Sequence, residues 1–161
     1  ASDVYKRQTV EGDELPGKAE FILGSGVESS WGKNVPDLEM REMEEMTKIG
    51  TGYFLTTPVF DLDSFEKFLK SVNTFGVPVI AEVLIIRNAS MGQFLNRHMR
   101  QGMVPDWVIK KLLRAPEKKK ASIEIFADIV TGLKDLCQGV HIISIGAEEQ
   151  LRHYMDAAKL Y

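Results

Sequence analysis

The side chains that could do chemistry lie mostly in or after short apolar segments. Glu82 interrupts the apolar run 78–85, and a charge in such a place requires a partner. Two partners remain open: Arg87 at the end of the same run, in a structural ion pair, or a bound ligand. Gly24-Ser25-Gly26 follows another apolar run, where glycines would let a ligand approach the backbone or would simply form a turn.

Three further features have structural interpretations. His141 opens an apolar run, where a packed histidine is more common than a catalytic one. Cys137 is expected to pack in the interior, and a single cysteine supplies too few thiolates for a metal cage, so no metal site is predicted. The run Lys118-Lys119-Lys120 is interpreted as a solvated helix start rather than a phosphate site.

Short apolar segments alternate with amphipathic helices, and these elements must position the groups above. We expect strands at residues 20–24, 52–56, 78–85 and 140–145. Helices are predicted over 37–49, from an N-cap at Asp63 to a stop at Gly76, and over 121–137 with Gly139 ending the last. Met40, Met43, Met46 and Ile49 form a stripe on the first helix that is expected to pack in the core.

This alternation predicts an α/β fold of the (β/α)₈ TIM-barrel type, with about four C-terminal βα units that make half a barrel. A five-stranded doubly wound sheet is the competing fold, but it would require one more strand and a phosphate-binding loop after the first. We predict that residues 19–161 form the half-barrel. Residues 1–18 are expected to be a flexible tail, and residues 2–8 resemble a translated sequencing adaptor.

The composition of the chain excludes some classes of binding partner. The 20 basic and 23 acidic residues give a net charge of −3, so no general positive field would attract nucleic acid or an anionic membrane. No apolar run approaches the roughly 20 residues of a membrane span, and no signal peptide is evident. We therefore expect a cytoplasmic protein that binds neither nucleic acid nor membrane.

Five segments, read in order, resemble the flavin-dependent methylenetetrahydrofolate reductases. Residues 50–61 are similar to a strand of that family with the pattern GA-x-F-x-x-T-Q-x-x-(F/Y)-D, and residues 139–142 to its last barrel strand. Residues 77–81, 88–98 and 104–108 are similar to its seventh strand, to the helix after it and to a following turn. The resemblance covers about 125 residues, from the fifth strand of the family's barrel to the eighth.

The resemblance implies reduction of 5,10-methylenetetrahydrofolate to 5-methyltetrahydrofolate by NAD(P)H through FAD, a step of one-carbon metabolism and methionine biosynthesis. Its acidic catalytic residues belong to strands expected in a missing N-terminal half, so catalytic residues are unknown and the isolated chain is expected to be inactive. The positions implied for the cofactor are Gly24, Gly26, Ser30, Glu39, Glu42, Glu45 and Met46. Those implied for the folate are Thr57, Glu82, Met91, Leu95 and Ala147.

Some of these positions depart from the family pattern. Glu42, Glu45 and Met46 stand where the family has an amide and cations, and carboxylates there would repel a pyrophosphate. Two alternatives therefore remain: a non-catalytic reductase-like binding or scaffold domain, and a pterin- or corrinoid-handling methyltransferase-type barrel. A homo-oligomer or a partner subunit is compatible with each of them.

Overall fold

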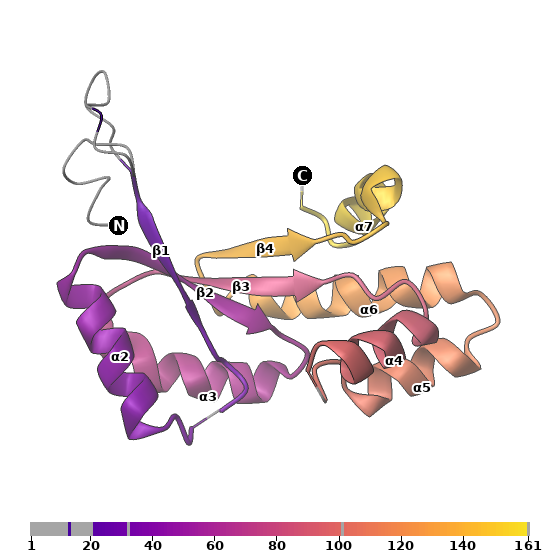
Figure 1. Cartoon of the computed structure of the whole chain (residues 1–161). Coiled ribbons are helices and arrows are strands. Elements are labelled where there is room, and N and C mark those ends of the chain that lie inside the picture. Colours follow the sequence, from indigo (N-terminus) through magenta and orange to yellow (C-terminus); the bar gives the residue numbers. More distant parts are fainter. Residues whose placement is uncertain (1–12, 14–20, 32, 101, 161) are drawn as a thin grey trace.

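The protein is seen in a computed structural model that describes residues 13, 21–31, 33–100 and 102–160. Four strands form one parallel sheet in the order β1-β2-β3-β4, with β1 and β4 at its edges. The strands are β1 (Leu23–Val27), β2 (Thr51–Pro58), β3 (Val79–Leu84) and β4 (Gly139–Ile143). Helices connect them along the chain, as Figure 1 shows. The prediction of consecutive parallel βα units in an α/β fold is confirmed.

The helices lie in the connections between strands and after β4. In Figure 1, α3 and α6 run along the same side of the sheet. The helices and short 3₁₀ turns are α2 (Asp37–Lys48), α3 (Leu62–Val72), η1 (Asn73–Phe75), α4 (Ala89–His98), α5 (Asp106–Arg114), α6 (Lys118–Leu133), η2 (Glu148–Gln150) and α7 (Leu151–Ala157). None of the helices in these ranges has the length and apolar character needed to cross a membrane.

Successive side chains along each strand point alternately to the two faces of the sheet. Phe54 and Ala81 are among the buried side chains of one face, which packs into the hydrophobic core against the helices. The opposite face is less buried. It carries Gly24 and Gly26 of β1, Tyr53, Leu55 and Thr57 of β2, Ile80 and Glu82 of β3, and His141 of β4. We call this second surface the open face.

The first strand begins later than the sequence suggested. β1 runs through Leu23–Val27, so Gly24 and Gly26 lie inside the strand, and the prediction that they follow it was wrong. A Cβ on Gly24 would lie 2.2 Å from Cζ of Tyr53, so this glycine makes room for the neighbouring ring. The strand is poor in β-branched residues, and its pairing with β2 rather than local propensity sets its position.

Two helix boundaries also differ from the prediction. α3 is capped by Asp61 rather than Asp63, because the Asp61 carboxylate accepts hydrogen bonds from the N–H and the hydroxyl of Ser64 at 3.0 and 2.9 Å. α6 begins at Lys118, so the lysine run forms its first turn. Gly139 opens β4 instead of ending the helix, whereas Gly76 does adopt the left-handed conformation expected at a stop.

The methionine stripe of α2 is only partly in the core. Met43 is 2% exposed and Met40 packs against the core, but Met46 and Ile49 are exposed. α2 ends at Lys48, so the last turn of the predicted stripe projects beyond the packed region. Cys137 is half-buried, and burial raises the pKa of its thiol, in agreement with a packing role. The predicted tail lies outside the described residues except for Asp13.

Candidate functional site

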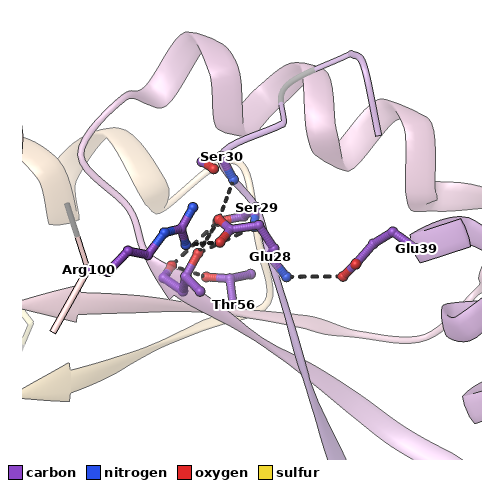
Figure 2. A network of polar contacts seen from close by, with 7 residues as sticks. Glu28, Ser29, Ser30, Glu39, Thr56 and Arg100 are labelled. Atoms are coloured by element: carbon purple, nitrogen blue, oxygen red, sulfur yellow. Dashed lines mark hydrogen bonds and ion pairs between the residues drawn. The ribbon is translucent and has the colours of Figure 1, made fainter. Parts of the chain in front are cut away.

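A polar cluster forms where β1 and β2 end, because the carboxyl ends of neighbouring parallel strands meet at one edge of a sheet. Glu28 comes directly after β1, and its Oε1 accepts hydrogen bonds from the hydroxyl of Thr57 at 2.8 Å and from the N–H of Ser30 at 3.0 Å. The guanidinium of Arg100 pairs with the other oxygen, Oε2. Figure 2 shows these contacts converging on one carboxylate. We call these residues the Glu28 cluster.

Two more residues fix this cluster to its surroundings. Ser29 is buried, and its N–H donates to Oγ1 of Thr57 at 3.4 Å. The N–H of Glu28 donates to Oε1 of Glu39 at 3.3 Å, which ties the end of β1 to the first turns of α2. The hydroxyl of Thr57 thus donates to one neighbour and accepts from another, and its remaining capacity is to accept a hydrogen bond.

The electrostatics of Glu28 follow from these contacts. Burial raises the pKa of the Glu28 carboxyl, but hydrogen bonds from Ser30, Thr57 and Arg100 lower it further than burial raises it. The net pKa lies below the usual range for glutamate, so Glu28 is a carboxylate at neutral pH. Its side chain is 16% exposed. A carboxylate held by so many donors acts as a fixed negative anchor rather than as a base.

Thr56, next to Thr57, forms hydrogen bonds with the main chain. Its buried hydroxyl donates to the carbonyl of Thr57 at 2.9 Å and accepts from the N–H of Glu82 at 3.1 Å. Because successive side chains of a strand point to opposite faces, Thr56 packs inward while Thr57 projects from the open face. The same contact fixes Glu82 beside the end of β2.

Glu82 is paired with His141 and not with Arg87. The two residues are direct partners in the register of β3 and β4, and Nδ1 of His141 lies 3.5 Å from Oε2 of Glu82. Burial raises the pKa of the Glu82 carboxyl, and His141 lowers it by less than burial raises it, so the net pKa lies above the usual range. His141 was expected to be packed; it is instead 52% exposed, because it lies on the open face of the edge strand β4.

An open depression of about 400 Å³ lies between these two groups. Its lining comes from three neighbouring strands and consists of Gly26, Val27, Glu28, Leu55, Thr56, Thr57 and Glu82. A Cβ on Gly26 would meet nothing within 4 Å, so the space above this glycine is free of protein. The depression therefore has a small, partly apolar floor with carboxyl and hydroxyl oxygens around it.

The structure brings together only some of the residues proposed from the sequence. Gly26, Thr57 and Glu82 line the depression, and Ser30 and Glu39 contact Glu28 beside it. Glu42 and Glu45 are exposed on α2, and Met46 is 39% exposed there. Met91 is half-buried, whereas Leu95 and Ala147 are buried at 5% and 1% and pack in the core. A ligand contact through Leu95 or Ala147 would require their neighbours to move.

Sequence reasoning missed Glu28, Ser29 and Arg100. The polar triplet 28–30 follows the first strand directly, and a correct strand end at Val27 would have placed Glu28 at the site. Arg100 lies 72 residues further along the chain in the connection after α4, and no local pattern relates it to β1.

The side chains present limit which cofactors and metal ions this part of the chain could hold. The α2 positions that the resemblance assigns to the adenylate part of FAD carry the carboxylates of Glu39, Glu42 and Glu45, and Glu45 pairs with Lys48 at 2.8 Å. Carboxylates do not fit a pyrophosphate, since like charges repel. Within the described ranges, no three His, Cys, Asp or Glu side chains gather to hold a metal ion.

Comparisons with known proteins agree with this architecture. The family model described as methylenetetrahydrofolate reductase matches residues 28–159. No curated protein matches the chain in sequence. A solved structure with a similar fold is an uncharacterised protein from Clostridium thermocellum that binds two copies of 5-methyl-5,6,7,8-tetrahydrofolic acid. It is 16% identical with a TM-score of 0.59, and the match covers 86% of this chain and 52% of that one.

This chain thus spans about half the length of that neighbour, as expected for a partial (β/α)₈ barrel. The family match begins at Glu28, at the end of β1, and continues through β4 and α7, so it includes the strand ends that carry the site. The chain belongs to the methylenetetrahydrofolate reductase family.

Proposed function

We propose that this chain contributes the folate-binding part of a strand-end site in a methylenetetrahydrofolate reductase-type barrel. The observation that carries the proposal is Thr57, the next-to-last residue of β2, which lies on the open face and lines the depression beside Glu28. Enzymes of this fold build their sites at the carboxyl ends of the strands. The folate ligand of the similarly folded Clostridium thermocellum protein supports the same class of ligand.

Hydrogen-bonding capacity supports a ligand rich in N–H groups. The proton of the Thr57 hydroxyl is used by Glu28, so Thr57 offers a ligand only an acceptor. Glu82 likewise offers carboxyl oxygen to the depression. A reduced pterin presents several N–H donors around a flat ring, which matches acceptors placed around a small apolar floor.

In the whole protein, we propose the family's reaction: reduction of 5,10-methylenetetrahydrofolate to 5-methyltetrahydrofolate with NAD(P)H. The part played by this chain's own residues is to bind and orient the pterin, through Thr57 and the Glu28 cluster. We assign no step to FAD here, because the carboxylates at the α2 positions do not fit its pyrophosphate.

The second candidate is a folate-binding domain without reductase activity. The observation that favours it is the same set of α2 carboxylates, Glu39, Glu42 and Glu45, at the positions implied for the cofactor. Purification of the chain tests this second candidate. Stoichiometric flavin retained by the purified chain would contradict the binding domain and support the reductase.

Calorimetric titration of the full chain with 5-methyltetrahydrofolate tests the proposal. Wild-type protein should bind, and Thr57→Val should weaken binding about tenfold, as expected for one lost hydrogen bond near a charged group. Thr131→Val, an exposed threonine on α6, is the matched control and should leave affinity unchanged. Absence of binding by wild-type protein, or equal affinity in Thr57→Val, would contradict the proposal.

A further inference from the structure

Glu82 is a charged group in a place where the fold does not need one. It lies on β3 between Ala81 and Val83, which are both fully buried on the opposite face. Its own side chain is 15% exposed. A carboxyl group that is largely removed from water and only partly paired costs stability, so its presence points to a use outside folding.

Within the described residues, the Glu82 carboxyl has one partner, His141, which approaches Oε2. The other oxygen, Oε1, has no hydrogen-bond partner among these residues, and the side chain lines the depression above Gly26. Arg87, the cation nearest in sequence, does not pair with it. Oε1 is therefore available as an acceptor and Oε2 can accept a second hydrogen bond, on the β3 side of the depression. Thr57 of β2 lies next to this side, and Glu28 lies beyond Thr57 after β1.

The surrounding groups restrict what can bind there. Glu28 is already neutralised by Arg100, and Thr57 can only accept. The walls of the depression therefore offer hydrogen-bond acceptors, and a ligand must supply hydrogen-bond donors. The 2-amino group and the N3–H of a pterin point in the same direction, and together they match the two oxygens of one carboxylate.

We propose that Glu82 is the residue that recognises the 2-amino and N3–H edge of a reduced pterin in the depression, with His141 positioning its carboxylate. This inference rests on the proposed folate-binding function and names the group that selects the pterin. Glu82 holds the pterin edge from β3, while Thr57 approaches the ring from the end of β2.

The test compares two small probes on the full chain: 6-methyltetrahydropterin and the corresponding tetrahydrolumazine, in which oxygen replaces the 2-amino group. Wild-type protein should prefer the pterin by about tenfold or more, because the lumazine lacks one donor and places an oxygen against a carboxylate. Glu82→Gln should weaken pterin binding and abolish most of the preference. Glu124→Gln, on an exposed part of α6, is the matched control and should keep both.

The outcomes are distinct. A preference lost in Glu82→Gln and kept in Glu124→Gln supports the inference, provided both variants melt cooperatively. Wild-type binding of the pterin with an equal preference in Glu82→Gln overturns the inference and leaves the proposed function standing. Wild-type protein that binds neither 5-methyltetrahydrofolate nor the pterin overturns both. His141→Gln should reduce the preference less than Glu82→Gln, and a larger loss would make the histidine the recognising group.

Discussion

Glu82 on β3 and His141 on β4 face each other across adjacent parallel strands, with Nδ1 of the histidine 3.5 Å from Oε2 of the glutamate. The carboxyl is largely buried and the imidazole is half-exposed. The interaction with His141 compensates for only part of the hydration free energy that the buried carboxylate loses. The pair therefore costs stability, a relationship often found at functional sites.

Glu82→Gln should stabilise the chain at neutral and higher pH. Burial holds the pKa of Glu82 above its unfolded value, so the folded state prefers the protonated carboxyl. The stability associated with this group is present below the unfolded pKa and is lost as pH rises through the folded pKa. The variant should gain on the order of 1 kcal/mol over wild type at pH 8 and almost nothing at pH 4, measured by urea unfolding.

Glu28→Gln should behave in the opposite way. The pKa of Glu28 is lowered in the folded state, so the stability it provides is present above the unfolded pKa and is lost as pH falls through the folded pKa. Replacing the carboxylate weakens bonds from Thr57, Ser30 and Arg100. We expect a loss of about 1–3 kcal/mol at pH 7 that shrinks at low pH. An equal loss at pH 3 and pH 7 would show that charge is not involved.

Arg100→Gln measures how much the ion pair with Arg100 contributes to the stability of the Glu28 cluster. The arginine is about half-exposed, so its ion pair should contribute less than the hydrogen bonds from Thr57 and Ser30. Urea unfolding at pH 7 should show a smaller loss for Arg100→Gln than for Glu28→Gln, and added salt should reduce it. A loss as large as that of Glu28→Gln would instead identify the ion pair as the main support of the cluster.

Much of the fold could be predicted because its signals are local. Parallel strands such as β3 appear as apolar runs, here interrupted only by Glu82, and amphipathic helices such as α3 repeat apolar residues at three and four positions. β1 was misplaced because Leu23–Val27 contains two glycines and a serine, and its strand character depends on pairing with β2. The N-cap at Asp61 was missed because Asp63 two residues later offers the same side chain.

The site was less accessible to sequence reasoning, because its contacts join distant segments. Glu82 was recognisable as a charge in an apolar strand, but its partner His141 depends on the register of two strands 59 residues apart. Thr57 could be assigned only through the family resemblance. The contact between Glu28 and Arg100 requires the connection after α4 to return to the end of β1, which no periodicity shows.

Gly26→Leu should abolish folate binding without damaging the fold. A side chain at this position meets no protein atom within 4 Å and would project into the depression. Removing a glycine from a strand also tends to stabilise it by roughly 0.5–1 kcal/mol. Calorimetry with 5-methyltetrahydrofolate should therefore show an affinity loss well above tenfold, with a thermal midpoint equal to or above that of wild type.

Gly139→Leu is the matched control for this substitution. Gly139 also has open space around it and lies at the opposite, amino-terminal end of β4. Its substitution should leave affinity unchanged. Equal losses in the two variants would show that the ligand does not occupy the depression at the carboxyl ends of the strands.

A buried pair of hydroxyl groups, on Ser122 and Tyr154, anchors α7 to the end of β3. Ser122 on α6 donates to the carbonyl of Ile86 at 2.7 Å, and its Oγ lies 2.9 Å from the hydroxyl of Tyr154 on α7. Both side chains are almost completely buried. Ser122→Ala should cost about 1–3 kcal/mol, because it leaves the Tyr154 hydroxyl without this partner in the interior.

Tyr154→Phe should cost less, roughly 0.5–1.5 kcal/mol, because Ser122 keeps its bond to Ile86 and the ring can still pack edge-on against Phe126. Once Ser122 is replaced, removing the tyrosine hydroxyl should be neutral or stabilising, since that hydroxyl has already lost its hydrogen bond to Ser122. The double variant should thus be less destabilised than the sum of the two single variants, as measured by urea unfolding. Strict additivity would mean that the two hydroxyl groups do not interact.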